Sequence, residues 1–106
     1  MRELKFIVRG QSLRKDPYCD FTHLIAGSVG HLRASFQFSD EWNGCTKVAR
    51  FWYDNSEHAV LIDDKNSCDI PSEVLNGESF SLSLIGAKDG YHIPTNETRV
   101  RQEVVR

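Results

Sequence analysis

The sequence has few of the features that mark membrane proteins, secreted proteins or nucleic-acid-binding proteins. No apolar run approaches the ~18 residues that a membrane-spanning helix needs. Met1-Arg2-Glu3 leads into a strand-like segment without the apolar region of a signal peptide. The formal net charge of -2 gives no general attraction to nucleic acid or anionic lipid. We therefore expect a protein used without Sec export, with no membrane contact and no direct nucleic-acid partner.

Cysteine is also scarce, with 3 residues in a chain of 106. Cys19, Cys45 and Cys68 are an odd number, widely spaced and without a C-x-x-C pair, so neither a disulfide framework nor a zinc site is indicated. Free buried thiols are the expected state, since free cysteine is among the most often buried residue types. A chain of this length can bury enough apolar surface to fold as one domain over residues 1–106.

Residues that carry catalytic chemistry are present only singly. The histidines have no spacing that aims two imidazoles at one metal, and they stand at His23, His31, His58 and His92. Gly27 and Gly30 lack the lysine and the strand-to-helix setting of a phosphate-binding loop. Asp63-Asp64 lacks the alternating oxygen ligands of a calcium loop, which favours a solvated turn. We expect no enzyme activity, no cofactor and no metal.

The clearest pattern is alternation of apolar and polar residues over 32–53. Leu32–Phe38 places alternate apolar side chains on one face, the period expected for a half-buried strand. A second strand is predicted at Thr46–Tyr53. Asn43-Gly44, in the turn between them, tolerates the positive φ angles of a tight reversal. We interpret the unit as a hairpin on which the other strands pack.

Further short strands are separated by turn residues. They are predicted at residues 3–9, 21–25, 57–63, 68–70, 80–84, 91–95 and 97–105. A polar turn is expected at 14–17, a single helical turn at 72–75, and a hairpin turn at Asp89-Gly90. The continuous apolar run at 60–62 indicates either a central strand covered on both faces or a strand near a sheet crossover.

These elements predict an all-β fold. About seven to nine short strands with frequent Gly, Asn, Asp and Pro turns are typical of an antiparallel two-layer sandwich, and we favour an immunoglobulin-like one. Periodicity does not fix the strand order, so a jelly roll or an open barrel stays open as an alternative.

Two groups of residues are candidates for binding a protein partner. Trp42 follows Asp40 and Glu41 on a turn, where it either touches a partner or caps the end of the sandwich. Arg99 and Arg101 share one face of the last predicted strand. Such a stripe could meet phosphates or an acidic partner, and a charged edge that discourages aggregation explains it equally well.

A longer series of residues resembles a known family. The series is Phe36-x-Phe38-Ser39-Asp40-Glu41-Trp42-x-Gly44, Lys47, Ala49-x-Phe51, Val60-Leu61-Ile62-Asp63, Cys68-x-Ile70-Pro71-x-Glu73-Val74-Leu75, Phe80-x-Leu82 and Thr95-Asn96. It resembles small β domains of phages and prophages of Gram-positive bacteria, which often stand at the N-terminus of tail, baseplate or fibre proteins. The resemblance implies a non-enzymatic structural or adaptor protein of the virion that acts through protein contacts.

Three functional hypotheses follow, and they differ in the partner. The first is a virion protein that binds another virion component or further copies of itself. The second is a small phage-encoded inhibitor that occludes a bacterial defence protein such as a CRISPR nuclease, in the host cytoplasm. The third is a carbohydrate-binding module that uses aromatic residues such as Trp42 and Tyr53.

Overall fold

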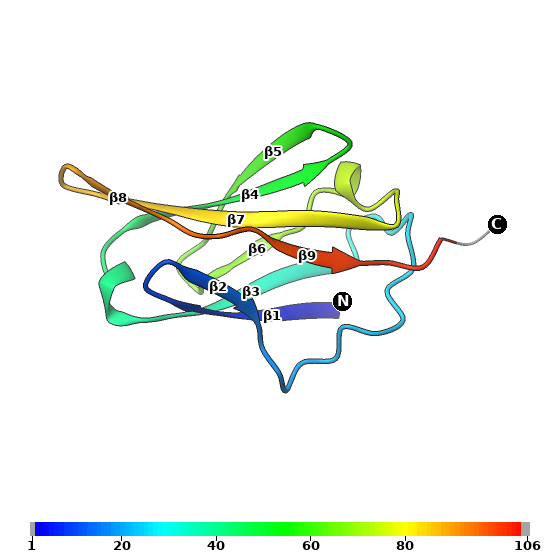
Figure 1. The fold of residues 1–106 in the computed structure, drawn as a ribbon, viewed down its shortest axis with the longest axis horizontal. Helices are drawn as coiled ribbons and strands as arrows, with labels where there is room; N and C mark the ends of the chain where they lie inside the picture. The colour runs from blue at the N-terminus through cyan, green and yellow to red at the C-terminus, as the bar shows by residue number, and fades with distance from the viewer. Residues whose placement is uncertain (1, 105–106) are drawn as a thin grey trace.

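A computed structural model describes residues 2–104 as a sandwich of two β-sheets (Figure 1). Within this range the strands are β1 (Arg2–Arg9), β2 (Ser12–Lys15), β3 (Leu32–Phe38), β4 (Thr46–Tyr53), β5 (Ser56–Leu61), β6 (Ser67–Asp69), β7 (Ser79–Lys88), β8 (Tyr91–Pro94) and β9 (Thr98–Arg101). Two single 3₁₀ turns, η1 (Asp40–Trp42) and η2 (Ser72–Val74), complete the fold. The predicted all-β sandwich is confirmed, and η2 lies where one helical turn was predicted.

The first sheet has the strand order β2-β1-β3-β6. β1 and β3 run parallel, with Phe6 opposite Phe36, whereas the other pairs in this sheet are antiparallel. A parallel pair needs a long crossover connection, and residues 16–31 provide it between β2 and β3. The sandwich is therefore not antiparallel throughout, as the sequence pattern suggested.

The second sheet is built around β7, the longest strand. Its order is β5-β4-β7-β8, and β9 also pairs with β7. β8 pairs with residues 85–88 of β7, and β9 pairs with residues 79–82. The predicted hairpin turn between β7 and β8 is confirmed, with positive φ at Asp89 (39°) and Gly90 (89°).

The predicted hairpin over 32–53 is wrong, although both of its strands are confirmed residue by residue. β3 belongs to the first sheet and β4 to the second, so the chain crosses between the layers through η1. Figure 1 shows this crossing at the left end of the sandwich. The buried side chains alternate in the same way whether two strands pair in one sheet or face each other across a core.

Three other predictions need correction. Arg14 and Lys15 end strand β2 instead of forming a polar turn. Residues 21–25 contribute one isolated bridge, between Ile25 and Glu103, instead of a strand. The run at 60–62 does not form a central strand, because β5 is at the edge of its sheet and Leu61 is 66% exposed. The alternative prediction, a strand near a sheet crossover, is confirmed, since the chain passes from β5 in the second sheet to β6 in the first.

The core lies between the two sheets. Its largest fully buried side chains come from both layers and from η1 and η2: Trp42, Phe6, Phe51, Phe80, Leu4, Leu13, Leu75, Leu82, Leu84, Val8, Val74 and Val100. Cys45 and Cys68 are buried as predicted, whereas Cys19 is half-buried. Over residues 2–104 there is no helix long and apolar enough to cross a membrane. β9 is shorter than the predicted strand 97–105, and Val105 lies outside the described residues.

Candidate functional site

Trp42 is a core residue, so its predicted contact with a partner is wrong. Its side chain is 0% exposed, and its ring centroid lies 5.1 Å from that of Phe38. The indole Nε1 donates a hydrogen bond to the carbonyl of Gly10 at 2.8 Å. A Cβ on Gly86 would approach Trp42 Cζ3 to 2.7 Å, so the indole packs directly on the backbone of β7. The alternative prediction, a cap at the end of the sandwich, is confirmed.

Asp40 and Glu41 stay exposed on η1. The pKa of Glu41 is held below its ordinary value, first by a hydrogen bond with the side chain of Ser39 and then by its own amide. The Ser39 hydroxyl also accepts a hydrogen bond from the Gly10 amide at 2.9 Å, which fixes the start of the crossing. Asp40 and Glu41 thus present negative charge at the end of the sandwich where the chain crosses from β3 to β4.

Arg99 and Arg101 project from the outer face of the second sheet. Both are exposed, while Val100 between them is fully buried, so the prediction that they share a face is confirmed. Arg99 lies opposite Ser81 of β7, and Arg101 lies opposite Ser79. The two arginines therefore have hydroxyl-bearing residues as their cross-strand neighbours.

Two shallow hollows meet beside these arginines. One, of about 340 Å³, is lined by Glu78, Ser79, Arg99, Arg101, Gln102 and Val104. The other, of about 360 Å³, is lined by Trp52, Tyr53, Asp54, Asn55, Ser79, Phe80, Ser81, Glu97 and Arg99. Ser79 and Arg99 belong to both. The outer face of β4, β7 and β9 is thus uneven and polar here, and wide enough for a partner's side chains.

Trp52 is the aromatic residue of this surface, and the sequence analysis did not select it. It is half-buried and lies opposite Ser81, which places it in one cross-strand row with Arg99. The guanidinium carbon of Arg50 lies 4.9 Å from the Trp52 ring centroid. The available signal was alternation, since Trp52 follows the buried Phe51 and must face outward.

Unlike Arg33 and Arg50, Arg99 and Arg101 form no ion pair among the described residues, a property that they share with Arg9 and Arg14 of the first sheet. Arg33 pairs with Asp63 at 3.1 Å and with Asp69 at 2.7 Å. Arg50 pairs with a glutamate of β5 at 3.3 Å. Between residues 2 and 104 no carboxylate lies within ion-pair distance of either Arg99 or Arg101. A partner's acid can bind them without displacing a carboxylate of this part of the chain.

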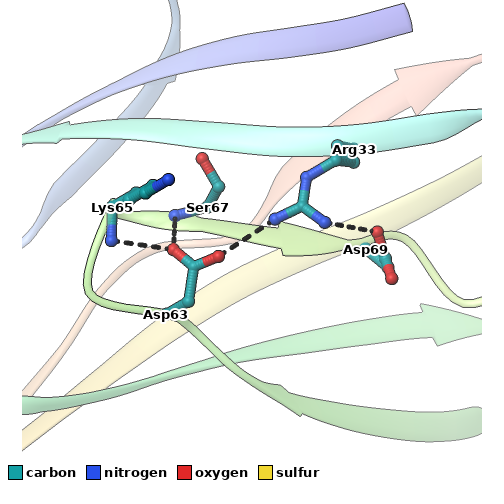
Figure 2. A network of polar contacts seen from close by, with 5 residues as sticks. All are labelled: Arg33, Asp63, Lys65, Ser67 and Asp69. Carbon is teal, nitrogen blue, oxygen red and sulfur yellow. Dashed lines mark hydrogen bonds and ion pairs between the residues drawn. The ribbon is translucent and has the colours of Figure 1, made fainter. Parts of the chain in front are cut away.

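The Asp63-Asp64 segment is a turn, as the sequence favoured. Figure 2 shows the Asp63 carboxylate accepting hydrogen bonds from the amides of Lys65 and Ser67 while it pairs with Arg33. The Ser67 amide is the largest of the influences that hold the pKa of Asp63 below its ordinary value. In the part of the chain that is described, no group of three or more His, Cys, Asp or Glu side chains could hold a metal ion.

The structure does not bring the two predicted groups together. Asp40 and Glu41 lie at the η1 end, whereas β9 lies toward the opposite end of the sandwich (Figure 1). We name the surface of Arg50, Trp52, Ser81, Arg99 and Arg101 the Arg99 surface, and take it as the candidate site. In comparisons with known proteins, no protein-family model, no curated protein and no solved structure matched the chain.

Proposed function

We propose that this chain is a non-enzymatic protein-binding module, a structural or adaptor protein of a phage virion, whose partner docks on the Arg99 surface. The observation that carries the proposal is the pair formed by Arg99 and Arg101. Within the described residues neither arginine has an acidic partner, and both stand on the sheet face that presents Trp52.

This combination suits a protein interface. Tryptophan and arginine are enriched among the residues that contribute most to binding energy. Arg99, Ser81 and Trp52 lie in one row across three paired strands, so their backbone is held by the sheet before binding. A preorganised surface loses less conformational entropy when a partner docks. The fitting partner presents carboxylates to the arginines and an apolar group to Trp52.

Supporting evidence for the virion role comes from the residues that resemble small phage β domains. Occlusion of a host defence protein would use the same kind of surface, and no contact among the described residues favours that alternative. The identity of the protein bound at the Arg99 surface therefore decides between the two roles.

Site-specific photo-crosslinking tests the proposal. Trp52 is replaced by the photoreactive residue p-benzoylphenylalanine, and the chain is produced in phage-infected bacteria. The matched control carries the same residue at Gln37, which is exposed on β3 of the other sheet. We expect an adduct with a virion protein at position 52 and none at position 37.

Charge reversal gives the second comparison. Arg99→Glu with Arg101→Glu should abolish the adduct, since two attractive contacts become repulsive. Arg9→Glu with Arg14→Glu makes the same charge change on exposed residues of the first sheet and should preserve it. An adduct with a host defence protein would replace the virion role with the inhibitor role. Equal labelling at positions 52 and 37 would overturn the assignment of the surface.

A further inference from the structure

The edges of the two sheets are protected unequally. β2, at one edge, is bonded by the side chains of Asn96 and Thr98, both of which reach Leu13. β6, at the other edge of that sheet, has only three residues. In the second sheet, the edge opposite β5 is divided between two short strands, β8 and β9, which pair with different parts of β7. β8 ends in Pro94. Beyond β9, Glu103 forms a bridge with Ile25. Among the strands of residues 2–104, β5 alone is an uninterrupted six-residue edge.

The backbone of β5 presents a regular set of open hydrogen-bonding groups. The two-residue turn Asp54-Asn55, with φ of 52° and 63°, places Ser56 opposite Tyr53. At the other end, the amide of Ile62 donates to the carbonyl of Lys47 at 2.9 Å. Because antiparallel partners alternate between bonded and non-bonded pairs, the odd-numbered residues of β5 direct their N–H and C=O groups away from β4. These residues are Glu57, Ala59 and Leu61.

The side chains of β5 do not discourage pairing. Natural edge strands are commonly protected by proline, by lysine or by an inward-pointing charge, and β5 has none of these. The charge of Glu57 is compensated within the sheet by Arg50, whose Nη2 lies 3.3 Å from the carboxylate. Leu61 is 66% exposed, so covering it removes apolar surface from water.

We propose that two copies of the chain pair antiparallel through β5, with Ala59 of each copy opposite Ala59 of the other. In this register each Glu57 lies opposite Leu61 of the other copy, and about six backbone hydrogen bonds form. The two sheets become one continuous sheet across a two-fold axis. The inference concerns an edge outside the Arg99 surface and goes beyond the proposed function.

The other two-fold registers are less favourable. If the two-fold axis passes through Glu57, the carboxylates of the two Glu57 residues lie opposite each other. If it passes through His58, the two imidazoles lie opposite each other. A centre at Val60 places Glu57 opposite Asp63, which brings like charges together. A centre at Leu61 would need pairing beyond residue 62, where the chain turns toward β6. Ala59 is therefore the centre that avoids like charges and uses the whole strand.

Sedimentation equilibrium with two backbone variants tests the pairing. A strand-edge contact buries less than a standard interface, so we expect a concentration-dependent dimer of the 12.1 kDa chain that becomes dominant by about 1 mM. Ala59→Pro removes an amide that points away from β4, a change that edge strands tolerate, and should give a monomer. Ala59→Ser keeps the amide and should keep the dimer.

Two side-chain variants keep the test decisive if Ala59→Pro does not fold. Leu61→Glu places a second carboxylate opposite Glu57 and should raise the dimer dissociation constant about tenfold or more. Leu61→Lys loses the same apolar contact but places a cation opposite Glu57, so it should weaken the dimer much less than Leu61→Glu does. A wild-type chain that stays monomeric at about 1 mM overturns the proposal. Equal dimerisation by the Leu61→Glu and Leu61→Lys variants overturns it as well.

Discussion

The side-chain amide of Asn96 bonds to both backbone groups of Leu13. Its Oδ1 accepts a hydrogen bond from the Leu13 amide at 2.7 Å, and its Nδ2 donates to the Leu13 carbonyl at 3.0 Å. A neighbouring strand would make the same two bonds to Leu13. One asparagine thus covers the edge of β2 and joins the first sheet to the segment between β8 and β9.

Asn96→Asp should destabilise the fold by about 1 kcal/mol, because the carboxylate cannot donate to the Leu13 carbonyl, which keeps only the Thr98 hydroxyl as a donor. Urea unfolding at neutral pH measures the loss. Asn76→Asp is the matched control, since Asn76 is exposed, and it should change stability by about 0.5 kcal/mol or less. Equal effects of the two changes would contradict the role of Asn96.

Trp42→Phe should cost about 1–3 kcal/mol, because the Gly10 carbonyl loses its donor. Trp52→Phe keeps an aromatic ring under Arg50 on the outer face and should cost about 1 kcal/mol or less. Urea unfolding compares the two variants. Tryptophan fluorescence provides the check, since loss of Trp42 should remove the emission of a buried indole. A larger cost at Trp52 would contradict the burial pattern.

Gly77→Ala should be destabilising by about 1–3 kcal/mol, because the added methyl group would overlap the ring of Tyr53. A double-mutant cycle isolates this contact. In a Tyr53→Ser background the ring is absent, so the added methyl group should cost much less. An unchanged cost in both backgrounds would mean that the backbone of Gly77, and not the ring, sets the penalty.

Alkylation should distinguish the three cysteines. Burial raises the pKa of the Cys68 thiol to about 12, so this residue has almost no reactive thiolate. Cys45 is also buried, whereas Cys19 is half-buried and its sulfur accepts a hydrogen bond from the Lys5 amide at 3.3 Å. Iodoacetamide at about pH 8 should modify Cys19 first in the folded protein. Peptide mass spectrometry identifies the site, and urea should expose all three.

The charge of Asp63 should contribute to stability in a pH-dependent way. Its pKa is lowered in the folded state, so the contribution is complete above the ordinary value near 4 and is lost as the pH falls through the folded value. The stability difference between the wild type and Asp63→Asn should stay constant above about pH 5 and shrink below about pH 4. Urea unfolding across this range measures it, and a difference that grew on acidification would contradict the linkage.

The sequence predicted individual strands better than their pairing. Leu32–Phe38 and Thr46–Tyr53 were both found without error. Leu32–Phe38 has a regularly alternating apolar face, whereas in Thr46–Tyr53 only Ala49 and Phe51 are buried. Alternation shows which side chains are buried and leaves open which strand covers them. The crossing between sheets depends on Trp42 packing against Gly86, a contact between residues far apart in the chain. The parallel pairing of β1 and β3 is likewise set by tertiary packing.

The candidate site was predictable in part. The shared face of Arg99 and Arg101 follows from their spacing along one strand. That Trp52 lies in the same row depends on the registers of β4 with β7 and of β7 with β9, which periodicity does not fix. The lack of a nearby carboxylate among the described residues is a property of the assembled sheet. For the same reason the sequence left Trp42 open between a partner contact and a cap, and its full burial follows only from the assembled fold.

The Asn96–Leu13 contact also bears on synthesis of the chain. The two residues are 83 positions apart, so β2 emerges from the ribosome long before the side chain that covers it. At about 5–20 residues per second, translation takes roughly 4–17 s to pass from Leu13 to Asn96. During that interval the edge of β2 is open to other nascent strands. Slowed translation or high expression should therefore increase aggregation before the finished chain loses any stability.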